Sequence, residues 1–422
     1  MAADILDELD WRGAVAHSTD ADALRAALAE SAVTFYCGFD PTAPSLHFGN
    51  LVQLVTMRRL QLAGHDPIAV VGGATGLIGD PSGRSAERSL NEADVVADWV
   101  EKIRVQVERY LEFSGAHAAR VVNNLDWTVS VSALDFLRDV GKHFSVNRML
   151  DKESVKARLD GPGISFTEFS YQILQAFDYL ELHRRYGCSL QTGGSDQWGN
   201  LTAGVDLIRR VTGASVHALA TPLITKADGT KYGKTADGTL WLDPKLTSPY
   251  AFYQYFLNQD DADIGSLLRI FSFRSQPEIE VLEGETAQHP EARSAQQALA
   301  SELTELVHGA DATSQAAAAS AALFGKGDLQ ELDAETLASA LGELPHAEVR
   351  GAMPSIVDLM VAAGLADSRT AARRTVTDGG AYLNNERVAD PEMLPGDGDL
   401  LHGRWLVLRR GKRSLAAIER VA

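Results

Sequence analysis

Two short stretches of the 422-residue chain combine glycine with hydrogen-bond donors, as a phosphate site requires. In "LHFGN" (residues 46–50), His47, Gly49 and Asn50 stand between a proline-rich turn and the apolar run "LVQLVTMRRLQLAG". A turn that opens a helix presents unpaired N–H groups and the positive end of the helix dipole. His47 and Asn50 can donate to the same phosphate, and Gly49 lets a ligand approach the backbone. The alternative is a helix cap with a surface histidine.

The second stretch, "TKADGTKYGKT" (residues 225–235), places three lysines among glycine, threonine and aspartate. Few apolar residues anchor it, which predicts a mobile loop. Lys231, Lys234 and Thr235 can close over a polyphosphate. The alternative is an exposed basic hairpin.

Two further stretches offer polar groups for a small ligand. In "FTEFSYQILQAFDYLEL", Tyr171, Gln175 and Asp178 stand at i, i+4 and i+7, so they share one face of a predicted helix. That face lines a pocket or is exposed to solvent. "LQTGGSDQWGN" sets Gln191 at a strand end and Asp196 and Gln197 at a helix start, which suits a ribose or an amino-acid head group or is an ordinary glycine-rich loop.

Five apolar runs, each ending in a glycine-rich or polar turn, are predicted strands that position these groups. They are "VTFYCGFDPT", "PIAVVGGATG", "RVVNNLDW", "CSLQTGGSDQ" and "VHALATPLIT". Because helical patterns separate them, we predict an α/β fold with a mostly parallel, helix-covered sheet. Ligands of such sheets bind outside the carboxyl ends of the strands.

The remaining patterns predict the domain organisation. We expect a catalytic domain over residues 1–225 with a helical insertion at about 125–163, and a mobile lysine loop over 226–246. A helical domain (247–330), a linker (331–353) and a small α+β unit (354–422) follow.

Composition limits the protein class. The chain has ordinary globular hydrophobicity, no apolar stretch of membrane-spanning length and no visible export signal at its N-terminus. Its only two cysteines, Cys37 and Cys188, argue against a metal site or a disulfide framework, so we expect a cytoplasmic protein without a protein-bound metal. A net charge of −18 argues against broad nucleic-acid binding, although residues 354–422 carry ten basic and nine acidic side chains and so differ from the rest.

Taken together, the motifs resemble class I aminoacyl-tRNA synthetases. "HFGN" is similar to the HIGH signature and "KYGKT" to the KMSKS signature, on either side of an interrupted nucleotide-binding sheet. The stretches "YCGFDPTAPSLH", "GGATGLIGDPSG", "SYQILQAFD", "QTGGSDQWGN" and "KADGTKYGKT" resemble those of the bacterial tyrosyl-tRNA synthetases. The likeness runs over residues 30–260 and more weakly to a C-terminal unit like a small RNA-binding fold. The chain departs from the HIGH signature at Asn50, where that signature has histidine.

The resemblance implies an enzyme that activates tyrosine with ATP and Mg²⁺ and transfers it to the terminal adenosine of tRNA(Tyr). It also implies roles for individual residues. Tyr36 and Asp178 would bracket the tyrosine hydroxyl; Asp80, Tyr171 and Gln175 would hold its ammonium group, with Gln191 and Gln197 nearby. Gly38, Asp40, Thr42, His47, Gly49 and Asn50 would line the ATP site, Asp196 would bind the ribose, and Lys231, Lys234 and Thr235 would close on the pyrophosphate.

The resemblance further implies a homodimer through the insertion, and tRNA contacts at the C-terminus. Candidates for these contacts are Arg369, Arg373, Arg374, Arg409, Arg410, Lys412 and Arg413. Three rival functions remain at this point: tryptophanyl-tRNA synthetase, another nucleotidyltransferase with a similar histidine turn, and a non-catalytic RNA-binding protein on a synthetase scaffold. Tyr36 and Asp178 suit a hydroxyl better than an indole, which favours tyrosine.

Overall fold

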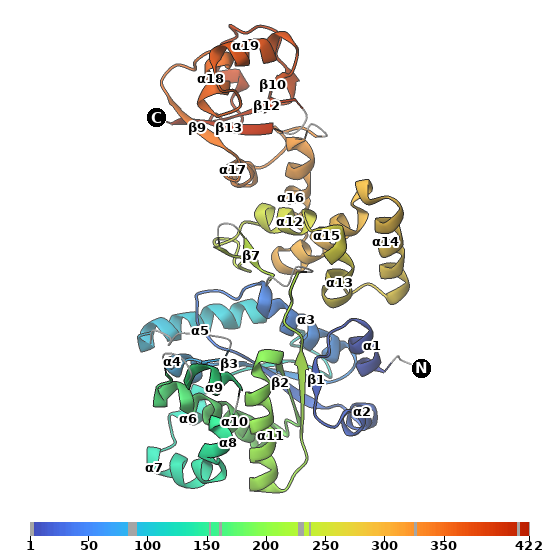
Figure 1. The fold of residues 1–422 in the computed structure, drawn as a ribbon, viewed down its shortest axis with the longest axis vertical. Helices are drawn as coiled ribbons and strands as arrows, with labels where there is room; N and C mark the ends of the chain where they lie inside the picture. The colour runs from blue at the N-terminus through green and yellow to red at the C-terminus, as the bar shows by residue number, and fades with distance from the viewer. Residues whose placement is uncertain are drawn as a thin grey trace. The chain divides into compact units, whose positions relative to one another are not determined.

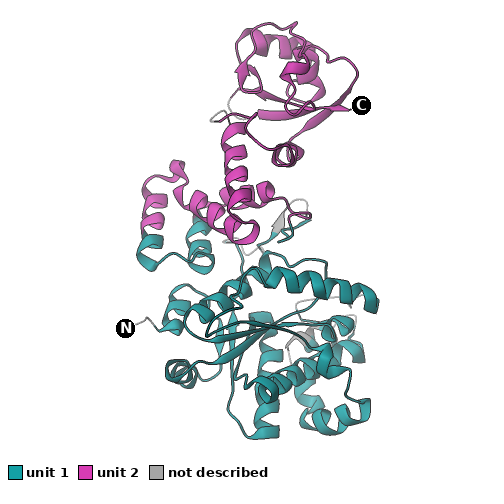
Figure 2. Ribbon diagram, turned by 180° about the vertical axis from the view of Figure 1, so that it is seen from behind, with its two compact units in different colours: residues 1–243, 262–280 teal, residues 244–261, 281–422 magenta. Residues whose placement is uncertain are grey.

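The computed structural model describes residues 4–82, 91–151, 153–159, 163–226, 232–235, 238–324, 327–411 and 414–421, without the side chains of residues 153, 154, 157, 234 and 235. The chain divides into two compact units (Figure 2). The first comprises residues 1–243 and 262–280, and the second comprises residues 244–261 and 281–422.

The first unit is built on a sheet with the strand order β1–β6–β5–β2–β3–β4 (Figure 1). Five of these strands pair in parallel and are the five predicted runs: β2 (Thr34–Phe39), β3 (Asp66–Val71), β4 (Arg120–Asn123), β5 (Leu190–Gly194) and β6 (His217–Thr221). The short β1 (His17–Ser18), which we did not predict, pairs antiparallel with β6 at the edge. The prediction of an α/β fold with a mostly parallel sheet is therefore confirmed.

Helices cover both faces of this sheet. α3 (Phe48–Leu62) and α5 (Ala93–Val107) lie on one face, and α10 (Phe166–Tyr186) and α11 (Trp198–Thr212) lie on the other (Figure 1). Buried apolar side chains of α10 and α11 pack with Tyr36, Ile68 and Val70 of the sheet. This packing brings the polar face of α10 to the carboxyl ends of β2 and β3.

Helix α10 has well-defined ends. The Ser165 hydroxyl accepts the Glu168 N–H at 3.3 Å as an N-cap, and Gly187, with a φ of +66°, ends the helix in the left-handed region. Glu168 also forms a buried ion pair with Arg158 at 2.7 Å. These contacts hold the first turn of α10 against the preceding segment.

The segment between β4 and α10, where we predicted a helical insertion, consists of short helices and turns. It contains α6 (Leu125–Thr128), α7 (Ala133–Asp135), α8 (Val146–Leu150) and α9 (Glu153–Leu159), with a π-helical turn at Phe136–Val140 and a 3₁₀ turn at Gly141–His143. Trp127 of α6 is buried in the core of the catalytic unit. The beginning of the insertion is thus part of that core.

The first unit also includes residues 262–280, which we had predicted to belong to one helical domain over 247–330; that prediction is wrong. Buried Arg12 donates to the carbonyls of Arg269 and Ser272, both at 2.9 Å, and to that of Arg274 at 2.8 Å. Buried Arg59 of α3 donates to Ile270 and Ser272. Because the last carbonyls of a helix lack intrahelical partners, these two guanidinium groups bind the end of α13 (Asp261–Phe271) to the catalytic unit.

The second unit starts with helices α12 (Pro249–Leu257), α15 (Ser294–His308), α16 (Ala310–Leu323) and α17 (Ala334–Gly342). A five-stranded sheet follows in the order β11–β10–β12–β13–β9, with bounds Glu386–Arg387, Ala381–Leu383, Trp405–Arg410, Ser414–Val421 and His346–Arg350. α18 (Ile356–Ala362) and α19 (Arg369–Thr377) pack on it, as predicted. The predicted linker over 331–353 is wrong, because α17 and β9 occupy it and β9 pairs in parallel with β13.

The other named elements of the described chain are shorter or peripheral. They are α1 (Ile5–Trp11), α2 (Ala21–Glu30), α4 (Thr75–Ile78), α14 (Gln276–Gln288), β7 (Lys234–Thr235) and β8 (Gly238–Thr239), with 3₁₀ turns at Ser195–Gln197, Pro290–Ala292 and Asp397–Asp399. Among the described residues, no helix is both long and apolar enough to cross a membrane.

Candidate active site

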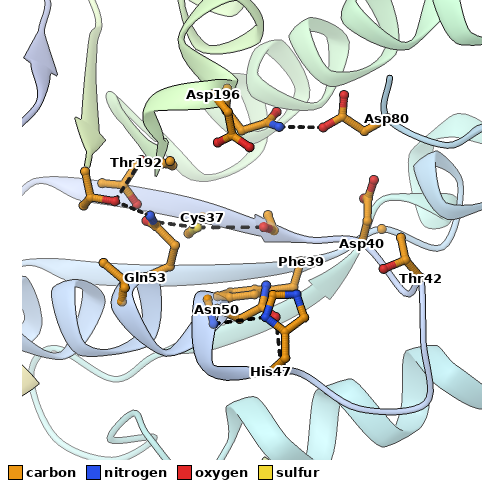
Figure 3. Close-up of a pocket in the computed structure, with 18 of the residues that line it drawn as sticks. Cys37, Phe39, Asp40, Thr42, His47, Asn50, Gln53, Asp80, Thr192 and Asp196 are labelled. Atoms are coloured by element: carbon orange, nitrogen blue, oxygen red, sulfur yellow. Dashed lines mark hydrogen bonds between the residues drawn. The ribbon is translucent and has the colours of Figure 1, made fainter. Parts of the chain in front are cut away.

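A cavity of about 450 Å³ opens at the carboxyl ends of the parallel strands of the first unit (Figure 3). Its walls come from the ends of β2 and β5, the first turns of α3 and one face of α10. The predicted site residues that line it are Tyr36, Gly38, Asp40, Thr42, His47, Gly49, Asn50, Asp80, Tyr171, Gln175, Asp178, Asp196 and Gln197. Residues from separate motifs are thus brought to one place.

Four predicted residues are not among the described lining residues. Gln191 is buried on β5, where a Cβ on Gly204 of α11 would lie 3.3 Å from its Oε1, so α11 covers it. Lys231 lies outside the described residues, and so do the side chains of Lys234 and Thr235. Within the predicted mobile loop over 226–246, residues 227–231, 236 and 237 lie outside the described residues.

At the deep end of the cavity, the carboxylate of Asp178 accepts hydrogen bonds from two side chains. Trp127 Nε1 donates to Asp178 Oδ1 at 2.8 Å, and Asn124 Nδ2 donates to Asp178 Oδ2 at 2.9 Å. Burial raises the pKa of Asp178 to about 7, and these two hydrogen bonds act in the opposite direction. Each carboxylate oxygen keeps a second acceptor position. Asp178 can therefore accept a further hydrogen bond from a ligand.

Two other groups that line the cavity lack partners in the described part of the chain. The Tyr36 hydroxyl and Gln175 Oε1 are buried without any hydrogen bond. Burial, and secondly the nearby Asp178, raises the pKa of Tyr36 well above its ordinary value, so its hydroxyl stays protonated. A buried polar group without a partner costs about 1–3 kcal/mol, which a polar ligand would recover. The arrangement suits a ligand hydroxyl that contacts Tyr36 and Asp178 together.

The middle of the cavity carries the carboxylates of Asp40 and Asp80, which accept hydrogen bonds from neighbouring side chains. Asp40 accepts from the Tyr171 hydroxyl and from the Thr75 hydroxyl, both at 2.7 Å. Gln197 Nε2 donates to Asp80 Oδ2 at 2.5 Å (Figure 3). Gly72 has to be glycine, because a Cβ there would lie 2.1 Å from Asp40 Oδ1. A cluster of carboxylates favours a cationic group such as an ammonium.

The outer end is formed by the first turn of α3. His47 is its N-cap: His47 Nδ1 accepts the Gly49 N–H at 3.0 Å, and Asn50 Oδ1 accepts the His47 N–H at 3.0 Å. Burial lowers the pKa of His47, so the ring is neutral. Because Nδ1 accepts, the proton is on Nε2. "LHFGN" thus caps a helix and also borders the cavity, and phosphate binding there stays a prediction.

Sequence reasoning missed several residues of this site. Trp127 falls in the predicted insertion, whereas Asn124 directly precedes it and follows a predicted strand, so the strand-end rule would have included Asn124. Thr75, Gln53 and Thr221 also line the cavity, and Gln53 Nε2 donates to Thr221 Oγ1 at 2.6 Å. Thr75 and Thr221 also lie at the ends of predicted strand runs, so the same rule points to them, whereas nothing in the local sequence marks Gln53. Within the described ranges, no three His, Cys, Asp or Glu side chains gather in a group that could hold a metal ion.

Two family models match the chain. That of the class I tRNA synthetases (W and Y) matches residues 28–325, and that of the tyrosine–tRNA ligase SYY-like C-terminal domain matches residues 336–418. The first match spans the whole cavity. The second begins within α17 and ends within β13.

Individual proteins agree with these matches. The tyrosine–tRNA ligase of Streptomyces avermitilis is 64% identical over 418 residues, covering 99% of both chains. That of Mycobacterium tuberculosis is 59% identical over 424 residues, covering all of both. Among solved structures, the C-terminally truncated mitochondrial tyrosyl-tRNA synthetase of Aspergillus nidulans aligns with a TM-score of 0.68 at 30% identity, over 74% of this chain and 92% of that one.

Proposed function

Because the chain belongs to the tyrosine–tRNA ligases of the class I aminoacyl-tRNA synthetase family, we propose a division of its cavity between the two small substrates. Tyrosine occupies the deep and middle parts, and ATP occupies the outer part beside α3. The tryptophan alternative is not favoured, since the relatives of high identity are tyrosine–tRNA ligases.

One observation carries the tyrosine assignment: the Tyr36 hydroxyl is buried without a partner among the described residues, at the same end of the cavity as Asp178. The substrate hydroxyl would donate to Asp178 and accept from Tyr36. Phenylalanine would leave both groups unpaired. Tyrosyl-tRNA synthetases as a class reject phenylalanine by about 10⁵-fold, a magnitude that we adopt rather than derive.

The ammonium group of tyrosine fits the acidic middle of the cavity. Asp80, Gln175 and the Tyr171 hydroxyl bonded to Asp40 would surround it, with Gln197 close by. Gln175 Oε1 has no partner among the described groups and can accept from an ammonium. Gln191 Oε1 is likewise buried without a partner among the described residues, but Gln191 does not line the cavity, so its place near the head group rests on the family resemblance.

ATP would lie against the first turn of α3, with its phosphates near His47 Nε2–H and the positive end of the helix dipole. The N–H groups of Phe48 and Gly49 already donate to the Leu240 carbonyl and to His47 Nδ1. Gly38, Asp40, Thr42, Gly49 and Asn50 would complete this side, and Asp196 would bind the ribose. Lys231, Lys234 and Thr235 would close on the pyrophosphate, a role that rests on the family resemblance. Mg²⁺ would enter as part of the ATP complex.

The reaction would proceed in two steps. The tyrosine carboxylate attacks the α-phosphorus of ATP, and the bond to the pyrophosphate leaving group breaks. The 2′-hydroxyl of the terminal adenosine of tRNA(Tyr) then attacks the adenylate carbonyl, and AMP leaves. Since no side chain has to act as nucleophile, catalysis consists of positioning and charge stabilisation.

Isolation of the intermediate tests this proposal. Enzyme incubated with labelled tyrosine, ATP and Mg²⁺, without tRNA, should retain tyrosyl-adenylate through gel filtration, and added tRNA(Tyr) should then receive the label. EDTA during the incubation should abolish retention, and excess Mg²⁺ should restore it. Retention that needs tRNA, or that persists in EDTA, would contradict the proposal.

Tyrosine binding should depend on the charge of Asp178. A protonated carboxyl binds the phenol hydroxyl less well, so the free enzyme should lose tyrosine affinity about tenfold per pH unit below about pH 7. Equilibrium dialysis from pH 5.5 to 8.5 measures this. In Trp127→Phe, which removes a donor that lowers the Asp178 pKa, the loss should begin at higher pH. A flat profile in both proteins would count against Asp178 as the acceptor.

For tRNA, we propose the exposed arginines of α19. Arg369, Arg373 and Arg374 form surface ion pairs with Asp358, Glu392 and Asp378. Such pairs are weak, so phosphates can displace the acids. Arg410 donates to the Leu365 carbonyl, Arg409 lies 4.0 Å from the Tyr382 ring centre, and Lys412 and Arg413 are outside the described residues.

Replacing Arg369, Arg373 and Arg374 together with alanine should therefore weaken tRNA binding without affecting adenylate formation. The slope of log affinity against log salt should become shallower by about 2, since each lost phosphate contact contributes about 0.7–0.9. Filter binding at several salt concentrations and pyrophosphate exchange measure the two effects. Arg25→Ala, which removes another paired surface arginine, should change neither. An unchanged slope in the triple variant would exclude α19 from the tRNA site.

We also propose that the reaction takes place in the cytoplasm, which the two free buried thiols suit.

We further propose a homodimer that forms through the insertion. The insertion and the start of α10 expose large apolar side chains, of which Leu134 is 79% and Phe166 75% exposed. Others are Val129, Leu137 and Val146. So many exposed apolar groups in one segment indicate an interface.

A charge at the proposed interface should dissociate the dimer. Leu134→Asp should sediment as a monomer at micromolar concentration, where the unaltered protein sediments as a dimer. Val281→Asp, at an apolar position of α14 that is 61% exposed, is the matched control and should remain dimeric. A monomeric unaltered protein, or a dimeric Leu134→Asp variant, would refute this interface.

A further inference from the structure

Three hydrogen bonds form a closed ring between α5 and the turn that precedes His47. Gln106 Nε2 donates to Ser45 Oγ at 3.1 Å, Ser45 Oγ donates to the Leu46 carbonyl at 2.7 Å, and the Leu46 N–H donates to Gln106 Oε1 at 2.8 Å. All three residues are buried. Because each member both donates and accepts, one side chain of α5 fixes the backbone immediately before His47.

The same turn also holds residues 240–243, which directly follow the β7–β8 hairpin. We call this hairpin, which is part of the predicted lysine loop, the lysine hairpin. Residues 240–243 run alongside residues 45–48, and His47 and Trp241 are antiparallel bridge partners. The bonds are Asp243 N–H to Ser45 Oγ (3.2 Å), Leu242 N–H to the Leu46 carbonyl (2.9 Å), Phe48 N–H to the Leu240 carbonyl (2.9 Å) and Leu240 N–H to the Gly233 carbonyl (2.8 Å). The ring therefore reaches both "HFGN" and the base of the hairpin.

Gln106 is a polar exception on its helix. The other buried residues of α5 are Val96, Val100, Ile103 and Val107, which form its apolar face. Burying an amide costs free energy unless the amide is hydrogen-bonded, and the amide of Gln106 forms its hydrogen bonds with Ser45 and Leu46. α5 supplies no described side chain to the cavity wall. Gln106 thus acts on the site only through the backbone that it holds.

We infer that Gln106 is a positioning residue for tyrosine activation. It keeps His47 and the base of the lysine hairpin in register with each other, and it touches neither substrate. The inference rests on the proposed role of His47 beside ATP. The groups assigned to tyrosine lie on β2 and α10, after α4 (Asp80) and in the turn before α11 (Gln197), all outside this ring. Loss of Gln106 should therefore slow the chemical step without weakening tyrosine binding.

A matched pair of substitutions tests this. Gln61 of α3 is also a buried glutamine that binds backbone: its Nε2 donates to the carbonyls of Glu112 and His117, both at 2.7 Å, and its Oε1 accepts the Glu112 N–H at 3.0 Å. Gln61→Leu and Gln106→Leu remove comparable bonds at different distances from His47. Single-turnover adenylate formation gives the rate constant and the tyrosine dissociation constant separately, and thermal unfolding verifies that each variant is folded.

Gln106→Leu should lower the rate constant about 10²-fold, the effect of a displacement of about 1 Å, while the tyrosine dissociation constant stays within about twofold. Gln61→Leu should change neither. Ser45→Ala, which keeps the bond between Gln106 and Leu46 but loses the link to Asp243, should fall between them and serves if Gln106→Leu does not fold. Equal rates in the Gln61 and Gln106 variants, or an unaltered rate in Ser45→Ala, would overturn the inference. Failure of the unaltered enzyme to form adenylate would instead overturn the proposed function.

Discussion

Asp178→Asn should lower kcat/KM for tyrosine by about a thousandfold and leave the KM for ATP nearly unchanged. The amide has one acceptor oxygen, whereas Trp127 and Asn124 both donate to the carboxylate. One donor then faces an NH₂ group, and the phenol hydroxyl loses a charged acceptor. The lost hydrogen bond from the phenol to a charged group accounts for about 1.5–3 kcal/mol, and a phenol hydroxyl that meets the amide NH₂ without an acceptor accounts for about 1–3 kcal/mol more, which makes about 4 kcal/mol together.

Steady-state pyrophosphate exchange with each substrate varied in turn measures this effect. Tyr36→Phe is the matched comparison, because it removes one neutral hydrogen bond and should cost only about tenfold. Both variants should discriminate less between tyrosine and phenylalanine. A loss below tenfold in Asp178→Asn, or an equal loss of ATP affinity, would show that this carboxylate does not bind the substrate hydroxyl.

His47→Asn should slow adenylate formation by about 10²–10³-fold with little change in tyrosine affinity. The asparagine oxygen can still accept the Gly49 N–H as a helix cap, but nothing replaces the Nε2–H donor. Removal of one donor that stabilises transition-state charge costs about 3–4 kcal/mol. Single-turnover kinetics with saturating tyrosine gives the rate.

His47→Gln separates the two functions of this residue. Its amide nitrogen can reach the position of Nε2, so it should be faster than His47→Asn, while loss of the cap should destabilise it by about 1 kcal/mol. Denaturant unfolding measures the second effect. If both variants matched the unaltered rate, His47 would be a helix cap only.

The strands and the main site could be predicted because their signals are local. Five apolar runs end in polar turns, and parallel strands bring such ends together. The stripe of Tyr171, Gln175 and Asp178 follows from helical periodicity alone, and all three line the cavity. What these signals could not give is which neighbours each side chain meets.

The misses are long-range contacts. Trp127 reaches Asp178 across 51 residues of chain, and its own sequence reads as part of a helical insertion. Gln191 sits beside Tyr36 in the sheet, yet α11 covers it because β5 lies under that helix. β9, with the sequence "HAEVR", has little apolar pattern and becomes a strand by pairing with β13 about 70 residues later.

The predicted domain boundaries differ from those of the structure for the same reason, because they also depend on long-range contacts. Arg12 and Arg59 bind the end of α13 through backbone carbonyls, which no sequence pattern marks. Every residue has a backbone carbonyl that can accept a hydrogen bond. Which carbonyls Arg12 and Arg59 bind therefore depends on the folded geometry alone.

The most direct test of the central claim, that this cavity selects an amino acid by its phenol hydroxyl, is pyrophosphate exchange into ATP with tyrosine, phenylalanine and tryptophan in turn. We predict exchange with tyrosine, exchange with phenylalanine lower by several orders of magnitude, and none with tryptophan. Comparable exchange with phenylalanine, or exchange with tryptophan alone, would contradict the claim.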